Sequence, residues 1–329
     1  MKEVHRDFRR FNRKTIFQCI VAFFFCAIAS QAVSATYPER PIRIICGSGA
    51  GGIVDITARI LAERMSANLG QPVVIENMPG AGSTIAIKAV ERSDPDGYTL
   101  LFSGAAISVV PALYPDSHID VLNDLKPVSA VGDTPLLLFV NKAVPGNNFK
   151  AVIDYLKANP NKTNSGSNGR GTGSYLAMAL FKKLAGVNVV NVMYRSTPQV
   201  LSDLVAGRIG MAFSADDNSI LQSPTIRPIA ITGRSRSSKF PRVSTFDELG
   251  LKGLESGSPT MLLAPKDTPQ PILAMLSKAV EKSLASPEMA KRLSQAGIVR
   301  PEQTGPGYAR TFLRSEVAKW GEILRESPK

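Results

Sequence analysis

The sequence predicts an α/β protein of two lobes that are connected by two crossings of the chain. Short apolar runs typical of buried strands alternate with segments whose apolar residues recur at helical spacing, which favours parallel sheets covered by helices. Two glycine-rich loops each separate a strand from a helix, and the apolar stretch Val128–Val140 and the strand Met261–Ala264 fit the two crossings. We therefore expect residues 36–135 and 260–329 to form the first lobe and residues 136–259 to form the second.

The first glycine-rich turn lies between a predicted strand and a predicted helix. Ile42–Cys46 is a short apolar run, and the glycines of Gly47–Gly52 let the backbone turn tightly and approach a ligand closely. Apolar residues then recur at helical spacing, at Ile53, Ile56, Ile60, Leu61, Met65 and Leu69. The first N–H groups of a helix lack partners and lie at the positive end of its dipole, so we expect this turn to bind a carboxylate or a phosphate. A turn that binds nothing is the alternative, because such turns are common in α/β folds.

The first lobe should hold a parallel sheet whose strand ends bring two loops together. Strand Pro72–Glu76, helix Ser83–Arg92 and strand Tyr98–Phe102 follow the first helix, which gives a βαβαβ order with right-handed crossovers. Ligands of such sheets bind beyond the carboxyl ends of the strands. Gly47–Gly52 and the pair Ser103-Gly104 both lie at that edge.

The second lobe repeats this arrangement around another glycine-rich loop. Helix Phe149–Asn159 and strand Thr163–Ser165 lead into the loop Gly166–Gly173, and helix Ser174–Ala185 follows. The remaining elements expected here are strand Val189–Tyr194, a helix from Pro198, and strands Met211–Phe213 and Ile226–Ile231. Two such loops facing each other across a cleft could hold one carboxylate from both sides or a dianion from both ends, and closure would strengthen each N–H···O⁻ contact by expelling water. No reaction is needed to explain this arrangement.

The first 35 residues are typical of a cleaved secretory signal peptide. Met1–Lys14 is basic, Ile16–Ala29 is apolar but short for a membrane span, and residues 33–35 form a small-residue cleavage site. We expect the exported protein to begin at Thr36. A retained membrane anchor is the alternative, which the short apolar run opposes, and the general secretory and twin-arginine routes both stay open.

The charge distribution does not indicate a nucleic-acid interface. The net charge is +12, of which the first 35 residues contribute +4 with six basic and two acidic side chains, leaving +8 for the rest. These remaining basic residues are scattered apart from a local run at Arg234, Arg236 and Lys239, and no basic stripe with interleaved aromatics occurs. We expect no nucleic-acid partner.

Groups suited to catalysis or metal binding are scarce. Cys19 and Cys26 leave with the signal peptide, so Cys46 is alone and no internal disulfide is expected. Cys46 ends a buried strand, where a free cysteine usually packs as a small apolar residue, and His118 is the only histidine left to pair with it. We therefore expect no catalytic residue, no metal site and no cofactor.

Several motifs occur in an order and spacing that are specific when taken together. They are Tyr37-Pro38 with Pro41-Ile42, Gly51-Gly52-x-x-Asp55-x-x-Ala58-Arg59, Gly70–Asn77, Pro79–Gly82, Pro95–Leu100, Gly171-Thr172 and Leu263–Pro265. Over essentially the whole mature chain, these residues resemble the extracytoplasmic solute receptors of tripartite tricarboxylate transporters, the Bug-type receptors. The resemblance implies a two-lobed periplasmic-binding-protein fold of the second type without enzymatic activity, with hinge crossings near Asp133–Leu137 and Ser258–Leu262. It also implies a periplasmic location, membrane permease subunits as partners, and a small carboxylate ligand held by main-chain amides and ordered water; we expect a monomer.

The ligand-binding residues can be placed partly by this resemblance. Those expected in the first lobe are Ser48, Gly51, Gly52, Asp55, Ser103 and Gly104. Those expected in the second lobe are Arg170, Gly171, Thr172, Gly173, Ser174, Arg195 and Asp216. The amides of Gly51 and Gly52 would donate to the carboxylate, while Asp55 would cap N–H groups or accept from the ligand or water, or serve only the helix dipole. Arg170 and Arg195 could take a second carboxylate bidentately, although most loop arginines are solvated.

Several cleft positions differ from the family pattern. These positions are Gly47, Ser48, Tyr175, Met193, Ser196, Thr197, Ser214, Ala215, Pro259 and Thr260. Because the changes fall at the expected rim, we infer a smaller and more polar cleft. A receptor that binds no small molecule stays open for the same reason.

Two other functions stay open. Gly47-x-Gly49-x-x-Gly52 matches the dinucleotide fingerprint, and Glu76 ends the next strand, where a ribose-binding acid belongs, so a secreted dinucleotide-binding oxidoreductase is one alternative. Export and the lack of a recognisable hydride-transfer site oppose it. A ligand-dependent periplasmic signalling receptor for a membrane sensor is the other, and it would share the same fold.

Overall fold

The structure, a computed structural model, describes residues 37–215, 223–255 and 257–325. The fold described here is that of residues 40–329, which form one compact unit. The predicted signal peptide, residues 1–35, and the predicted mature N-terminus at Thr36 lie outside the described residues. Within the described ranges, no helix is long and apolar enough to cross a membrane.

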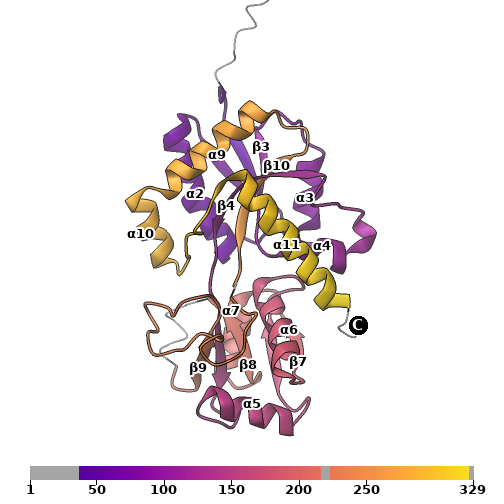
Figure 1. Cartoon of the computed structure of the whole chain (residues 1–329), viewed down its shortest axis with the longest axis vertical. Helices are drawn as coiled ribbons and strands as arrows, with labels where there is room; N and C mark the ends of the chain where they lie inside the picture. The colour runs from indigo at the N-terminus through magenta and orange to yellow at the C-terminus, as the bar shows by residue number, and fades with distance from the viewer. Residues whose placement is uncertain (1–36, 216–222, 256, 326–329) are drawn as a thin grey trace, which may run out of the picture. The chain divides into compact units, whose positions relative to one another are not determined.

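Two five-stranded sheets form the framework of residues 40–329 (Figure 1). The first has the order β2-β1-β3-β10-β4, and its strands are β1 (Ile42–Cys46), β2 (Val73–Asn77), β3 (Thr99–Ser103), β4 (Leu125–Gly132) and β10 (Thr260–Pro265). β1 pairs in parallel with β2 and β3, which confirms the predicted βαβαβ order, and β10 runs antiparallel between β3 and β4. The register places Cys46 beside Asn77 and Phe102, so β1, β2 and β3 end at one edge.

Helices cover both faces of the first sheet. On one side lie α2 (Ile53–Leu69), α9 (Gln270–Leu284) and α10 (Pro287–Gln295); on the other lie α3 (Thr84–Glu91), α4 (Ala106–Leu113) and α11 (Gly305–Arg325). Short 3-10 segments, Ala81–Ser83 and Pro115–Ser117, precede α3 and follow α4. Apolar side chains of α3, α4 and α11 pack with strand residues such as Ile45, Leu101 and Leu263 in one cluster. Burial of both faces explains why these strands are almost continuously apolar in sequence.

The second sheet has the strand order β7-β6-β8-β5-β9. Its strands are β5 (Leu137–Asn141), β6 (Asn164–Ser167), β7 (Val190–Met193), β8 (Met211–Ser214) and β9 (Ile226–Ile231), and its helices are α5 (Phe149–Ala158), α6 (Gly173–Ala185) and α7 (Thr197–Val205). β6 pairs in parallel with β7 and β8, whereas β5 runs antiparallel to β8 and β9. The carboxyl ends of β6, β7 and β8 therefore share one edge.

The strand before the second glycine-rich loop is longer than the sequence predicted. Gly166 and Ser167 were assigned to the loop, but they belong to β6 and pair with β7. A Cβ at Gly166 would lie 2.5 Å from Ile209 Cδ1 and 2.9 Å from Val200 Cγ1, so close packing requires a glycine within the strand. The loop itself spans residues 168–172, and most other predicted boundaries lie within one residue of the observed ones.

Two short segments carry the chain between the sheets. β4 continues into β5 through residues 133–136, and the chain returns into β10 through residues 257–259. The Thr134 N–H donates to Ser258 O at 3.3 Å, and the Ser258 N–H donates to Thr134 O at 2.9 Å. A Cβ at Gly257 would lie 1.9 Å from Thr134 O, so the crossings come this close only because residue 257 is glycine.

Helix α11 contacts the cores of both sheets. Near its start, the Gly305 N–H donates to Ser129 Oγ at 3.1 Å, and Leu313 packs in the cluster of the first sheet. Near its end, the buried Trp320 packs in a cluster with Phe181 of α6. The helix is thus a third, noncovalent connection beside the two crossings.

Candidate functional site

The first candidate loop is the Gly47–Gly52 turn between β1 and α2. Gly51 has a φ of +77°, which favours glycine, and Gly52 is the extended N-cap residue of α2. The Gly51 N–H donates to Asp55 Oδ2 at 2.9 Å, and the Gly52 N–H donates to Gly49 O at 3.4 Å. The sequence assigned both amides to a ligand carboxylate, but in this structure each has a partner inside the protein.

Asp55 closes this turn from the first turn of α2. The side chain is buried, and its carboxylate accepts hydrogen bonds from Gly51, Arg59 and Asn77. Burial alone would raise the pKa of Asp55, but these hydrogen bonds hold the pKa below its ordinary value of 3.8. Ser48 lies in the same turn, and its carbonyl accepts from Asn77 Nδ2 at 3.0 Å. The Asp55 carboxylate is therefore a buried negative charge whose hydrogen-bond donors all come from the protein itself.

Ser103 and Gly104 follow β3 at the edge shared with this turn. Ser103 is fully buried, and its hydroxyl lies 3.4 Å from Gly104 O. A Cβ at Gly104 would lie 2.8 Å from Val54 Cγ2 and 3.8 Å from Pro259 O. Gly104 therefore lies between the first turn of α2 and the return crossing, and the predicted first-lobe segments come together.

Side-chain hydrogen bonds shape the second glycine-rich loop at the start of α6. Thr172 is the extended N-cap residue, and its Oγ1 donates to Gly169 O at 2.8 Å. Ser174 Oγ donates to Asn168 Oδ1 at 2.7 Å, and Asn168 Nδ2 donates to Thr197 Oγ1 at 3.1 Å. The sequence did not predict Asn168 as a site residue, and it indicated Thr197 only as a cleft position that differs from the family pattern. Asn168 directly follows β6, and Thr197 lies at the start of α7. Polar residues at such positions could have been predicted as site residues, because ligands of these sheets bind beyond the carboxyl ends of the strands.

This loop lies against α4, the helix that follows the end of β3. Gly171 has a φ of +83°, and a Cβ there would lie 2.9 Å from Val109 Cγ2 of α4. Gly173 is equally close to the return crossing, because a Cβ there would lie 2.7 Å from Ser258 Cβ. Glycine at both positions permits these approaches. The structure thus brings the second-lobe loop to elements that directly adjoin the first-lobe edge.

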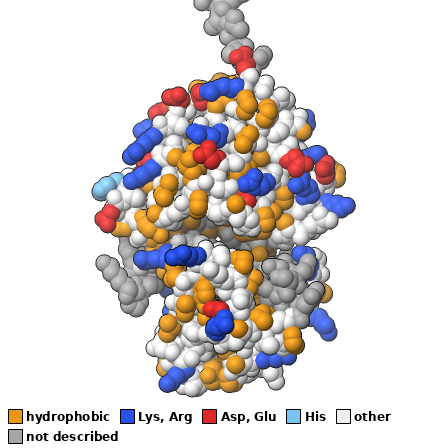
Figure 2. Space-filling view, turned by 180° about the vertical axis from the view of Figure 1, so that it is seen from behind, with side chains coloured by type: hydrophobic (Ala, Val, Ile, Leu, Met, Phe, Trp, Pro, Cys, Tyr) orange, Lys and Arg blue, Asp and Glu red, His pale blue; other side chains and the backbone are white. Residues whose placement is uncertain are grey.

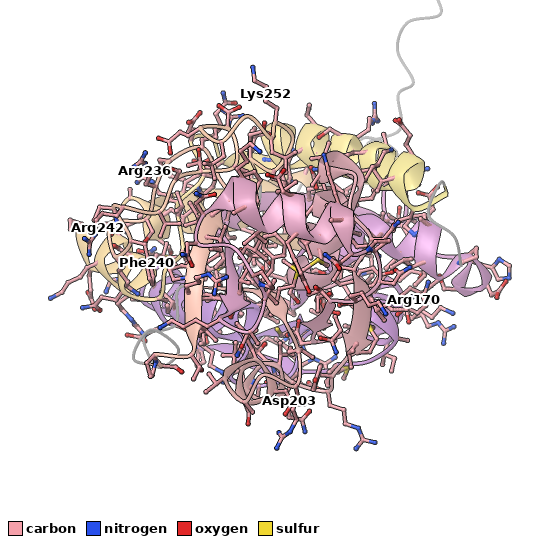
Figure 3. All side chains as sticks on the ribbon, turned by 90° about the horizontal axis from the view of Figure 1, so that it is seen from below. Arg170, Asp203, Arg236, Phe240, Arg242 and Lys252 are labelled. Carbon is pink, nitrogen blue, oxygen red and sulfur yellow. The ribbon has the colours of Figure 1, made fainter. Side chains whose placement is uncertain are left out.

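Two arginines flank the second loop. Arg170, which Figure 3 labels, and Arg195, just after β7, are both exposed. Across residues 37–215, 223–255 and 257–325, neither guanidinium forms an ion pair. Their charges are therefore available to an anion at this edge. Asp216, the remaining predicted residue, lies outside the described residues.

The other basic residues do not form a continuous surface. On the face shown in Figure 2, Lys and Arg side chains are dispersed among hydrophobic and neutral ones. Within the local basic run, Arg236 pairs with Glu248 at 2.8 Å and Lys239 Nζ donates to Gln295 O at 3.3 Å. Such a dispersed pattern is not typical of a nucleic-acid interface.

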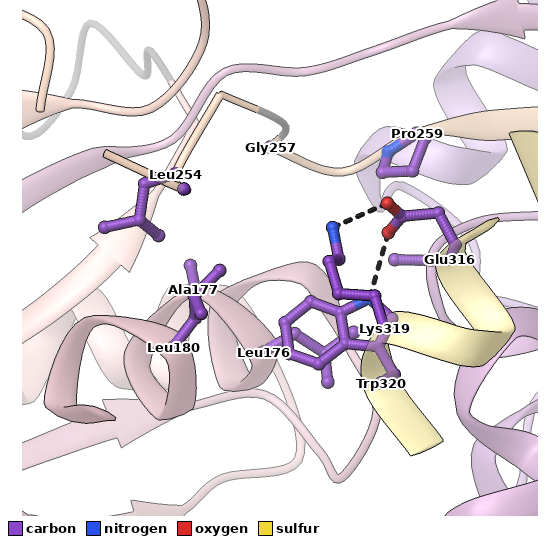
Figure 4. Close-up of a pocket in the computed structure, with 11 residues that line it drawn as sticks. Leu176, Ala177, Leu180, Leu254, Gly257, Pro259, Glu316, Lys319 and Trp320 are labelled. Atoms are coloured by element: carbon purple, nitrogen blue, oxygen red, sulfur yellow. Dashed lines mark hydrogen bonds and ion pairs between the residues drawn. The ribbon is translucent and has the colours of Figure 1, made fainter. Parts of the chain in front are cut away.

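A small cavity lies between α6 and α11, lined in part by Leu176, Leu180 and Trp320 (Figure 4). Its volume is about 10 Å³, which is room for about one water molecule. Glu316, also in its lining, is buried and accepts from Trp320 Nε1 at 2.9 Å and from Lys319 Nζ at 2.5 Å. The small volume and the buried carboxylate both exclude an organic anion from this cavity.

The surroundings of Cys46 and Glu76 bear on two alternative functions. Cys46 would be the nucleophile of a thiol enzyme, and Glu76 would bind the ribose in a dinucleotide enzyme. Burial raises the pKa of the Cys46 thiol to about 11, so the thiol is protonated near neutral pH and is a poor nucleophile. Glu76 Oε2 accepts from Arg43 Nη1 at 3.2 Å on the neighbouring strand. Among the described residues, no group of three or more His, Cys, Asp or Glu side chains could hold a metal ion.

Comparison with known protein sequences gives one consistent result. Residues 57–328 match the family model described as the receptor of the tripartite tricarboxylate transporter family. The chain is 33% identical over 308 residues to the protein BugT of Bordetella pertussis, an alignment that covers 91% of this chain and 93% of that protein.

Solved structures agree with this match. The periplasmic binding protein BugD has a TM-score of 0.77 at 32% identity, covering 88% of this chain and 98% of its own. MatC from Rhodopseudomonas palustris with bound malate has a TM-score of 0.78 at 30% identity, covering 88% and 100%. Another R. palustris protein, solved with adipate, has a TM-score of 0.79 at 28% identity, covering 88% and 97%. The predicted two-lobed periplasmic-binding-protein fold is thereby confirmed.

Proposed function

The chain belongs to the receptor family of tripartite tricarboxylate transporters, and on that premise we propose that it captures a small carboxylate between its two lobes. The observation that carries this proposal is the approach of the second glycine-rich loop to α4 at Gly171. Each lobe contributes a loop at the carboxyl edge of its sheet, immediately before the N-terminus of a helix. A ligand in this place would meet partial positive charge from both lobes.

The ligand class that we propose is a short dicarboxylate. Malate and adipate, bound by the two R. palustris relatives, belong to this class. One carboxylate would take the start of α6, where Thr172, Gly173 and Ser174 lie, with Arg170 or Arg195 beside it. The other carboxylate would take the Gly47–Gly52 turn of the first lobe. Micromolar affinity corresponds to about −8 kcal/mol, which a few charge-assisted hydrogen bonds of about 1.5–3 kcal/mol each supply after ordering costs.

The proposed role is transport without catalysis. The receptor would act in the periplasm as a monomer. It would deliver its ligand to membrane permease subunits, because the family is named as the receptor of a transporter. The ligand would favour the closed arrangement of the lobes only by the extra contacts it makes there. Co-purification with a permease tests this role, whereas co-purification with a sensor kinase instead contradicts it.

A thermal-shift screen of residues 36–329, refolded to remove carried-over ligand, tests the binding proposal. The panel holds mono-, di- and tricarboxylates, acidic and amide amino acids, nicotinate-type acids and NAD(H). At one hundred times Kd a ligand adds about 2.7 kcal/mol to the free energy of unfolding, so a dicarboxylate should raise the midpoint clearly. A shift with NAD(H) alone would overturn the proposal in favour of a dinucleotide enzyme, and no shift with any compound would contradict small-molecule capture.

A further inference from the structure

We propose that Asp55, Arg59 and Asn77 form a clamp that positions the Gly47–Gly52 turn for ligand capture and does not itself touch the ligand. The inference rests on the proposed function, because a positioned turn matters only if the turn takes part in binding. Asp55 and Arg59 stand one helical turn apart on α2, and Asn77 is the last residue of β2. The pairing of β1 with β2 brings Asn77 to the start of α2.

Each member of the clamp contacts the other two. Arg59 Nε donates to Asp55 Oδ2 at 3.0 Å, and Arg59 Nη2 lies 3.0 Å from Asp55 Oδ1, so the pair is bidentate. Arg59 Nη2 also donates to Asn77 Oδ1 at 2.9 Å, and Asn77 Nδ2 donates to Asp55 Oδ1 at 2.8 Å. The contacts form a closed ring, so no member can change rotamer without breaking its bonds to both others.

The clamp fixes two backbone atoms of the turn. Asp55 Oδ2 accepts from the Gly51 N–H at 2.9 Å, and Asn77 Nδ2 donates to Ser48 O at 3.0 Å. Ser48 and Gly51 bracket the exposed residues 49 and 50 at the tip of the turn. A glycine-rich segment has many accessible backbone conformations, and these two bonds select one of them. The turn is thereby ordered before the ligand arrives, which removes an ordering cost from binding.

The bonding of Asp55 leaves no place for a ligand at its carboxylate. Oδ1 accepts from Asn77 and pairs with Arg59, whereas Oδ2 accepts from Gly51 and Arg59. The carboxylate is buried, so an anionic ligand would be repelled and a ligand donor would find both oxygens engaged. Asp55 therefore acts through the turn, and the Gly51 amide is part of the clamp rather than of the ligand site.

Hydrogen exchange of the Gly51 amide tests the clamp in the ligand-free protein. Arg59→Met removes the guanidinium, and Asp55→Asn removes the charge with little change of shape. We expect the Gly51 amide to exchange about tenfold faster in either variant. Arg64→Met is the matched control, because it removes the ion pair with Glu288 (2.7 Å) from the same helix and should leave Gly51 exchange unchanged. Unchanged exchange in both clamp variants would overturn the clamp, whatever the protein binds.

Calorimetric titration with malate and with adipate tests the positioning role. We expect Arg59→Met to weaken both dicarboxylates by the same factor, about tenfold, because the ordered turn is lost rather than a ligand contact. Arg64→Met should bind both as the wild type does. A changed ratio of the malate and adipate affinities would mean that the clamp touches the ligand, which overturns the positioning role. If the wild type binds neither, the proposed ligand class fails and the exchange measurement still decides the clamp.

The pH dependence separates positioning from a general loss of stability. The titratable and charged groups that face Asp55 are Arg59 from α2 and the neutral thiol of Cys46 at the end of β1, and Asn77 from β2 is uncharged. Without Arg59 the Asp55 carboxyl binds a proton at higher pH. The ratio of wild-type to Arg59→Met malate affinity should therefore rise as the pH falls from about 7 to about 4.5, while titration of malate itself cancels in the ratio. A constant ratio would show that the charge pair does not position the turn.

Discussion

Replacing Gly171 with alanine puts a methyl group where the second glycine-rich loop meets α4. The added Cβ would lie 2.9 Å from Val109 Cγ2, 3.7 Å from Leu113 Cδ1 and 3.9 Å from Ala106 Cα. Val109 is fully buried, so its side chain has little room to move aside. The substitution therefore separates the second glycine-rich loop from α4, and these two surfaces lie together beside the proposed ligand site.

Two effects add up to the expected destabilisation by Gly171→Ala. The backbone at Gly171 has a φ of +83°, and a left-handed conformation costs about 1–2 kcal/mol for a residue with a Cβ. Overpacking against Val109 adds about 1–3 kcal/mol. We expect the free energy of unfolding to fall by about 2–5 kcal/mol, which lowers the unfolding midpoint by about 3–8 °C for a protein of this size.

Thermal unfolding and calorimetric titration with malate provide the assay. We expect Gly171→Ala to weaken malate binding about tenfold, because the loop must move away from α4. Gly49→Ala is the control for stability alone, because a Cβ there has nothing within 4 Å and should change the free energy of unfolding by less than about 0.5 kcal/mol. Adding Val109→Ala to Gly171→Ala should restore the affinity for malate, because it makes room for the new methyl group. It should not restore the stability that is lost through the left-handed backbone at residue 171. If Gly171→Ala unfolds at the same midpoint as Gly49→Ala and binds malate as tightly as the wild type does, the loop does not rest on α4.

Four other side chains give independent measurements. Cys46 should resist alkylation at about pH 8 in the folded protein and react in urea, because its buried thiol has a pKa of about 11; equal labelling rates would contradict this. Trp320→Phe should lower the free energy of unfolding in urea by about 1.5–3 kcal/mol, since it removes the hydrogen bond to Glu316, and an unchanged midpoint would oppose this. Arg170→Ala should weaken a dicarboxylate far more than a monocarboxylate in calorimetry, and equal losses would exclude a second carboxylate there. Folding lowers the pKa of Asp55 from 3.8, so the stabilisation by its carboxylate is present above pH 3.8 and is lost as the pH falls through the folded pKa. In Asp55→Asn the free energy of unfolding should therefore depend less on pH in that range. An identical pH dependence in the variant and the wild type would count against the pKa shift.

The strands of the core could be predicted from sequence because burial imposes a visible pattern. β1 and β9 begin and end at the predicted residues, and β1 is apolar because helices cover both faces of its sheet. β6 reads Asn-Ser-Gly-Ser, so it carries no apolar signal. Its buried Ser165 and Ser167 hydrogen-bond to Asn191 on β7 instead. Such a strand is recognisable only after its neighbours are in place.

The partners of the site's amides could not be predicted from sequence. Helical spacing brings Arg59 to Asp55, but Asn77 reaches them only through the register between β1 and β2. From sequence alone, the Gly51 N–H could donate to a ligand or to Asp55. It donates to Asp55 because Arg59 and Asn77 hold the Asp55 carboxylate beside it. Likewise, the motif around Gly171 predicts a ligand role for this residue, whereas its contact with Val109 depends on how α4 packs.

The most direct test of carboxylate capture is a crystal structure of the protein with the dicarboxylate that gives the largest thermal shift. We expect the dicarboxylate to lie between the Gly47–Gly52 turn and residues 168–174, with both lobes in contact with it and with Asp55 still hydrogen-bonded to Gly51. A dicarboxylate bound outside this space, or touching one lobe alone, would contradict the central claim.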